Sequence, residues 1–96
     1  MSTLTPSQLE LLLQELEYWD VVDGNKLHRQ FNFEDFKSAL DFVNIVGRIS
    51  DAINHHPDIK FSWGVVDVYV FTHKLNTITE KDSNLAKKIQ EVYHGT

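Results

Sequence analysis

The feature that most constrains the fold of this chain is a long apolar stretch with helical spacing, from about Phe33 to Asn54, for which Asn32 is a plausible N-cap. At about 100° per residue, its apolar side chains cover an arc of roughly 260°. They are Phe36, Ala39, Leu40, Phe42, Val43, Ile45, Val46, Ile49 and Ile53. Because one sheet cannot cover so wide an arc, we expect part of this helix to pack against another chain.

Two pairs of strands are predicted on either side of this helix. The first pair, residues 19–22 and 26–33, is joined by Asp23-Gly24-Asn25, where glycine and asparagine tolerate a positive φ. The second pair covers residues 59–63 and 66–72, with a glycine between them, and its second strand alternates valines with other residues. Each pair therefore predicts an antiparallel hairpin.

Helices are predicted at both ends of the chain. Thr5-Pro6-Ser7-Gln8 combines a capping box with a proline at the first helical position, and begins a helix that we expect to end near Tyr18. Thr79-Glu80-Lys81-Asp82 is a similar pattern that begins the last helix. The predicted order is α-β-β-α-β-β-α, an α+β chain that we expect to form a single domain over residues 1–96.

Composition excludes several classes of function. The chain has 96 residues, 42% of them hydrophobic, a net charge of −5 and no cysteine, so it can bury one core but offers no thiol or disulfide chemistry. No cluster of lysine and arginine appears, so we expect no direct contact with nucleic acid. No apolar run is long enough to span a membrane and no signal peptide is apparent, so we expect a cytoplasmic protein.

Three of the five histidines lie within nineteen residues, in Asn54-His55-His56-Pro57 and Thr72-His73. Histidine is the side chain best suited to proton transfer near neutral pH. If the strand after Pro57 pairs with the strand before His73, both clusters meet at one edge of the sheet. Asp51, four residues before His55, is expected to orient that ring, and Trp63 could form a flat wall for a planar ligand.

Each of these residues also has a structural explanation. A helix C-terminus favours a histidine such as His55, the capping box explains Asp82, and Trp63 could belong to the core. Three histidines and an aspartate could also bind zinc, but no pair of histidines has helical spacing and no cysteine is present. A serine nucleophile is a weaker alternative, because no serine lies in an elbow motif.

The spacing resembles a known signature. Asp51-x3-His55-His56-Pro57-x5-Trp63-x9-His73-x8-Asp82 is similar to that of the pterin-4a-carbinolamine dehydratases, and the similarity extends over roughly residues 5–93. The resemblance implies a four-stranded antiparallel sheet with helices packed on one face. It also implies a homodimer joined edge to edge through its sheets, or a homotetramer in which dimers associate through the long helices.

The resemblance further implies a reaction, the loss of water from 4a-hydroxytetrahydrobiopterin to give a quinonoid dihydropterin. This reaction recycles the cofactor of aromatic amino acid hydroxylases and requires no metal or other cofactor. It implies that His55 and His73 transfer protons, without dividing acid and base between them, and that His56 binds and orients the pterin in the catalytic site. Asp82 would hold a histidine or contact the pterin, and Trp63 would shape the pocket. Asp51 would contact a residue of the site without touching the pterin.

One segment departs from the family pattern, and one alternative function stays open. Thr77 and Ile78 stand where the family usually carries Gly-Leu, so we expect Asn76 to take over the turn near His73. The alternative is a dimeric interaction module, or a scaffold resembling a transcriptional coactivator, that binds a helical partner through the long helix. The apolar arc of residues 33–54 motivates this second hypothesis.

Overall fold

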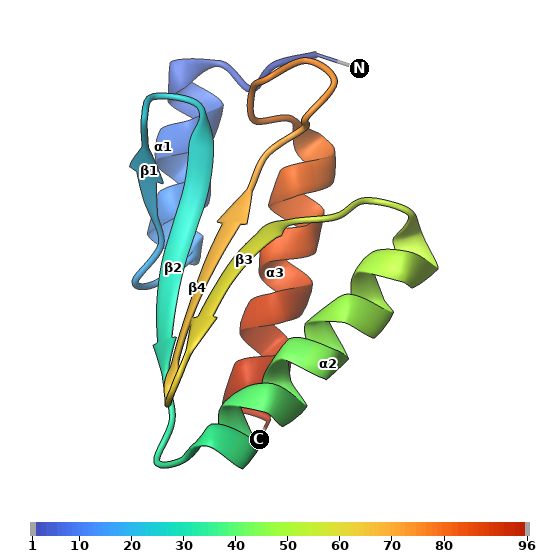
Figure 1. Cartoon of the computed structure of the whole chain (residues 1–96). Helices are drawn as coiled ribbons and strands as arrows, with labels where there is room; N and C mark the ends of the chain where they lie inside the picture. The colour runs from blue at the N-terminus through green and yellow to red at the C-terminus, as the bar shows by residue number, and fades with distance from the viewer. Residues whose placement is uncertain (1, 96) are drawn as a thin grey trace.

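The predicted element order is confirmed by the computed structural model, which describes residues 2–95 (Figure 1). The elements are α1 (Pro6–Glu15), β1 (Asp20–Val22), β2 (Lys26–Asn32), α2 (Phe36–Ile53), β3 (Asp58–Ser62), β4 (Val65–Val70) and α3 (Glu80–His94). The four strands form one antiparallel sheet in the order β1-β2-β4-β3. This is the expected α+β fold, and it leaves β1 and β3 as the edge strands.

The core lies between one face of the sheet and the three helices. Strand side chains alternate between buried and accessible positions, and the register places Leu27 opposite Val70 and Phe31 opposite Val66 on the buried face. The helices contribute the fully buried Ala39, Val46, Leu85, Ala86 and Ile89. The opposite face of the sheet is more polar: Gln30, Asp67 and Lys60 form one row across β2, β4 and β3, and His28 lies opposite Tyr69.

Arg29 is the exception among the apolar residues of the buried face. Its guanidinium lies against the rings of Tyr18, Phe31 and Tyr93, at 4.6–5.1 Å from their centroids, and donates to the side chain of Gln90. Burial of this cation lowers the pKa of Arg29 below its usual value. The aromatic rings therefore provide much of the favourable environment that a carboxylate would usually give.

Two helix boundaries differ from the sequence prediction. The N-cap of α2 is Asp35, which accepts from the Ser38 amide at 2.8 Å, and not Asn32. Asn32 is occupied in β2, where it pairs with Val65, so the chain needs three more residues before the helix can begin. Helix α1 ends at Glu15 and not near Tyr18, which has a φ of 72° and so cannot continue a helix.

Helix α2 buries only part of its apolar arc. Ala39, Phe42 and Val46 face the core, whereas Phe36 and Leu40 remain 48% and 38% exposed. The ring of Phe36 stacks on that of Phe61 in the edge strand β3, with centroids 4.9 Å apart. An apolar surface is therefore left open beside α2, as the width of the arc indicated. None of the helices within residues 2–95 is long and apolar enough to cross a bilayer.

The loop between β4 and α3 turns at Asn76, as predicted. Asn76 has a φ of 53°, and the loop closes through the Thr72 amide, which donates to the carbonyl of Thr77 at 2.8 Å. The side-chain amide of Asn25 donates to the Asn76 Oδ1 at 2.9 Å. Asparagine is the residue besides glycine that best tolerates this left-handed conformation, so Asn76 can form the turn without a glycine.

We expect Asn76→Ala to be less stable than Asn76→Gly by about 1 kcal/mol, because alanine is strained at positive φ and glycine is not. Both variants lose the contact with Asn25, so the difference between them isolates the backbone strain. Urea denaturation followed by circular dichroism measures it. Equal stability of the two variants would contradict the assigned role of Asn76.

Candidate active site

The two histidine clusters lie at the same end of the sheet. Strand β3 pairs with β4 so that Asp58 faces Tyr69, which places the loop carrying His56 beside the loop carrying His73 (Figure 1). The Nε2 atom of His73 lies 2.9 Å from the Asp58 carboxylate and joins the two loops directly. The strand pairing on which the predicted meeting depended is therefore confirmed.

Asp82 binds the end of α2 to the end of β4. Its Oδ1 lies 2.5 Å from the Nε2 of His55, while its Oδ2 accepts from the Thr72 hydroxyl at 2.7 Å and the Thr79 amide at 2.8 Å. Asp82 is fully buried and the side chain of His55 is 11% exposed. The same carboxylate thus caps α3 and fixes His55. Asp82 therefore has both the structural role of a helix cap and a contact with a histidine.

The predicted pairing of Asp51 with His55 is wrong, because Asp51 lies 2.8 Å from the Nε2 of His56. Helix α2 ends at Ile53, and Asn54 takes a left-handed conformation with a φ of 54°. The four-residue spacing aligns side chains only while the helix continues, so it no longer applies at His55. The His56–Asp51 pair is exposed, with 53% and 82% of the two side chains accessible.

All three histidines share one geometry. In each, the Nε2 atom contacts a carboxylate oxygen, at distances of 2.5–2.9 Å. A carboxylate can only accept a hydrogen bond, so Nε2 carries the proton and donates. Within residues 2–95 the Nδ1 atoms of these rings have no hydrogen-bond partner, so Nδ1 is the nitrogen of each ring that is open to a ligand.

Trp63 does not lie beside the histidines of the same chain. It follows β3 in the turn to β4, at the opposite end of a strand that is about 16 Å long, and is 66% exposed. It is thus neither a core residue nor a wall of the histidine cluster within one copy of the chain.

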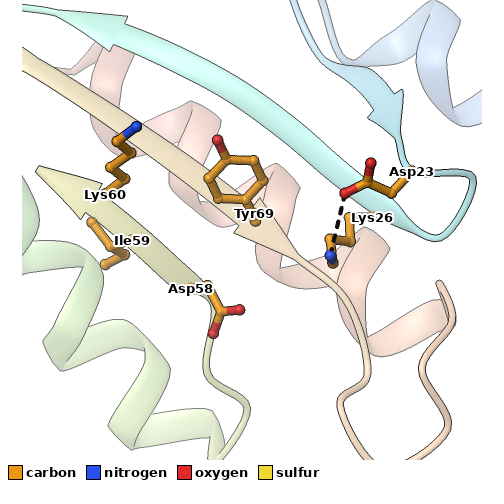
Figure 2. A pocket seen from close by; sticks show the side chains of 6 residues that line it. All are labelled: Asp23, Lys26, Asp58, Ile59, Lys60 and Tyr69. Atoms are coloured by element: carbon orange, nitrogen blue, oxygen red, sulfur yellow. Dashed lines mark hydrogen bonds and ion pairs between the residues drawn. The ribbon is translucent and has the colours of Figure 1, made fainter.

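A cavity of about 360 Å³ opens next to this cluster, on the polar side of the sheet (Figure 2). Asp58, which holds His73, forms part of its wall together with Ile59, Lys60 and Tyr69. Lys26 and Asp23, paired at 3.4 Å, close it from the hairpin of β1 and β2. A planar molecule that contacts His73 therefore has polar groups and one phenol ring within reach.

Sequence reasoning did not identify two parts of this site. Asp58 orients His73, and the hydroxyls of Thr72 and Thr79 lie 2.8 Å apart beside Asp82. The position of Asp58, first in the strand after Pro57, was a usable signal, because a strand pairing brings that residue to the loop of His73. The contacts of Thr72 and Thr79 depend on the path of the loop between them, and no pattern in the sequence indicates them. Among residues 2–95, no group of three or more histidine and acidic side chains is arranged to hold a metal ion.

Known proteins of one family resemble this chain over nearly its whole length. The family model described as pterin 4 alpha carbinolamine dehydratase matches residues 2–92 of the chain. A protein of Rubrobacter xylanophilus that is provisionally named a pterin-4-alpha-carbinolamine dehydratase is 46% identical, over 93% of this chain and 83% of its own length. A protein of Sulfurisphaera tokodaii with the same provisional name is 39% identical, over 96% of this chain and 98% of its own.

Solved structures give the same result for the fold. A crystal structure from Brucella melitensis, described as a transcriptional coactivator/pterin dehydratase, superposes with a TM-score of 0.90 at 32% identity, over 96% of this chain and 99% of that one. A pterin dehydratase-like protein described as a RuBisCO assembly factor of the alpha-carboxysome superposes with a TM-score of 0.68 over 80% of this chain and 90% of that one. At 18% identity, the second likeness concerns the fold alone.

We expect Asp82→Ala to lower the free energy of unfolding by about 3 kcal/mol, because it leaves buried hydrogen-bond donors without their acceptor. Asp51→Ala is the matched control, since it removes the partner of an exposed histidine and should cost no more than about 1 kcal/mol. Urea denaturation of both variants measures the difference. Similar losses in the two variants would contradict the structural role assigned to Asp82.

Proposed function

This chain belongs to the pterin-4a-carbinolamine dehydratase family, and we propose that it removes water from 4a-hydroxytetrahydrobiopterin to give the quinonoid dihydropterin. The observation that carries the proposal is the geometry of the three histidines. Each is oriented through Nε2 by an aspartate, and all three lie at one end of the sheet. We also propose that this product is returned to the cofactor pool of an aromatic amino acid hydroxylase.

The reaction needs two proton transfers and no change in redox state. The C4a–O bond breaks and its oxygen leaves as water after receiving a proton from an acid. The N5–H proton passes to a base, and the electron pair of that bond forms the C4a=N5 double bond. One imidazole with a proton on Nδ1 and one without can supply both steps, and together they regain their starting state by exchanging one proton with solvent.

His55 and His73 are the proposed pair for proton transfer. The Thr72 hydroxyl links them, because Thr72 donates to the carboxylate that holds His55 and directly precedes His73 in the chain. The ring of His73 packs on Phe71 with centroids 4.1 Å apart, which limits its rotation. The ring of His55 is therefore fixed before the substrate arrives and the ring of His73 is partly restricted, and both effects lower the entropic cost of the reaction.

His56 is the proposed binding residue of the catalytic site. Its pair with Asp51 is exposed on both sides, so the ring can adjust to a ligand at small energetic cost. Asp82 has its oxygens engaged by His55, Thr72 and Thr79, so we assign it to holding His55 and not to contact with the pterin. Asp51 supports His56, and Trp63 could reach a pocket only on another copy of the chain.

We expect the wild-type protein to accelerate dehydration of chemically generated 4a-hydroxytetrahydrobiopterin, measured at pH 8 by the absorbance of the quinonoid product. His55→Ala and His73→Ala should each lower kcat by about 10²-fold or more, as expected for loss of a general acid or base. His56→Ala should mainly raise KM. His28→Ala is the control: this histidine lies in the sheet between Asp20 and Asp67 and should change kcat little. A wild-type rate equal to that of buffer would refute the proposed function.

A second function is favoured by the open apolar surface beside α2. We propose that Phe36 and Leu40, exposed in the single chain, pack against another copy of the chain or a helical partner protein. This would give the homodimer or homotetramer that the family resemblance implies. Phe42 is 1% exposed and belongs to the core, so it is not suited to testing this surface.

We expect Leu40→Glu to reduce the mass of the particle in solution at micromolar concentration, because a carboxylate cannot be buried in an apolar interface. Light scattering measures the mass, and circular dichroism confirms that the variant is folded. Lys37→Glu, at an exposed position one turn earlier, is the control and should leave the mass unchanged. A wild-type protein that is already a monomer would exclude self-association through this surface.

A further inference from the structure

We propose that Asn25, in the turn between β1 and β2, is a positioning residue for His73 in the dehydration reaction. The inference rests on the proposed function, because it concerns one of the two histidines assigned to proton transfer. Asn25 contacts Asn76, three residues after His73 in the loop that leads to α3. It therefore acts on His73 through the loop and not by touching the ring or the pterin.

The segment that carries His73, residues 73–76, is exposed and is tied to other elements at two points. Its backbone hydrogen bonds are local, such as the Asn76 amide donating to the His73 carbonyl at 3.2 Å. Among residues 2–95, only Asp58 and Asn25 make hydrogen bonds to this segment from other elements. Asp58 holds the ring of His73, so Asn25 is the contact that holds the backbone carrying the ring.

The contact between Asn25 and Asn76 requires a hydrogen-bond donor at Asn25. The Nδ2 atom of Asn25 donates to the Asn76 side-chain Oδ1 at 2.9 Å and to the Asn76 carbonyl oxygen at 3.3 Å. A backbone carbonyl can only accept, so an oxygen in place of this Nδ2 would lose that bond. The pair of hydrogen bonds reaches both the side chain and the backbone of Asn76, and thereby fixes the residue at which the loop turns.

The same hairpin turn also contacts the ring on which His73 packs. Phe71 lies against His73, and it is only 6% exposed although it does not belong to the core between the sheet and the helices. The ammonium of Lys26 lies over the Phe71 ring, 5.2 Å from its centroid, and pairs with Asp23 at 3.4 Å (Figure 2). The turn between β1 and β2 therefore contacts both the loop of His73 and the ring beneath it.

We expect Asn25→Ala to lower kcat about three- to tenfold and to change KM less than about twofold, because a displaced proton-transfer group affects the reacting geometry more than binding. Asn25 does not have a left-handed backbone, so alanine removes the contact without adding strain. Asn25→Gln keeps an amide donor and should recover part of the lost rate. Gln14→Ala, which removes an exposed amide from α1, is the control and should leave kcat and KM unchanged.

Two further measurements separate positioning from a loss of stability. The double variant Asn25→Ala/His73→Ala should have the same kcat as His73→Ala, because Asn25 acts only through His73. In NMR spectra of Asn25→Ala, the ring signals of His73 should shift while those of His56 stay in place.

Three results would overturn the inference and leave the proposed function standing. They are an unchanged kcat in Asn25→Ala, a loss of kcat that persists in full when His73 is already alanine, and unchanged ring signals of His73. If the wild-type protein does not turn over the substrate, the proposed function fails and the inference fails with it.

Discussion

The buried carboxylate of Asp82 is the constraint on which the rest of the site depends. One of its oxygens begins α3 by accepting from the Thr79 amide, and the other holds the imidazole of His55 at the end of α2. The hydroxyl of Thr72 adds the end of β4 to the same carboxylate. A group that is fully buried must satisfy all its hydrogen bonds within the protein, so three element ends have a fixed separation.

This arrangement explains why the histidines lie at element ends and not within helices or strands. Asn54 turns the chain in a left-handed conformation, and Pro57 prevents α2 from continuing, so His55 and His56 leave the helix in different directions. Strand β3 then begins at Asp58, beside the loop that carries His73. The elements provide rigid supports, and the loops between them orient the rings without belonging to a regular structure.

The sequence predicted the elements well because each carries its own periodicity, and it predicted that the histidine clusters meet, because β3 and β4 form a hairpin. The partners of the histidines could not be predicted in the same way. Helical spacing linked Asp51 to His55, but the helix ends before His55, and Asp51 contacts His56 instead. Asn32 is a residue type that favours an N-cap, but it pairs with Val65 in the sheet and cannot begin the helix. In the first case the end of the helix removed the basis of the local rule, and in the second case tertiary pairing outweighed it.

The three histidine–aspartate pairs differ in burial, and this difference separates their physical roles. The His55–Asp82 pair is almost closed to water, so its geometry is tied to the stability of the fold. The pairs of His56 and His73 are about half exposed, so their rings can move without disturbing the core. A substrate at this end of the sheet therefore meets one fixed ring and two adjustable ones.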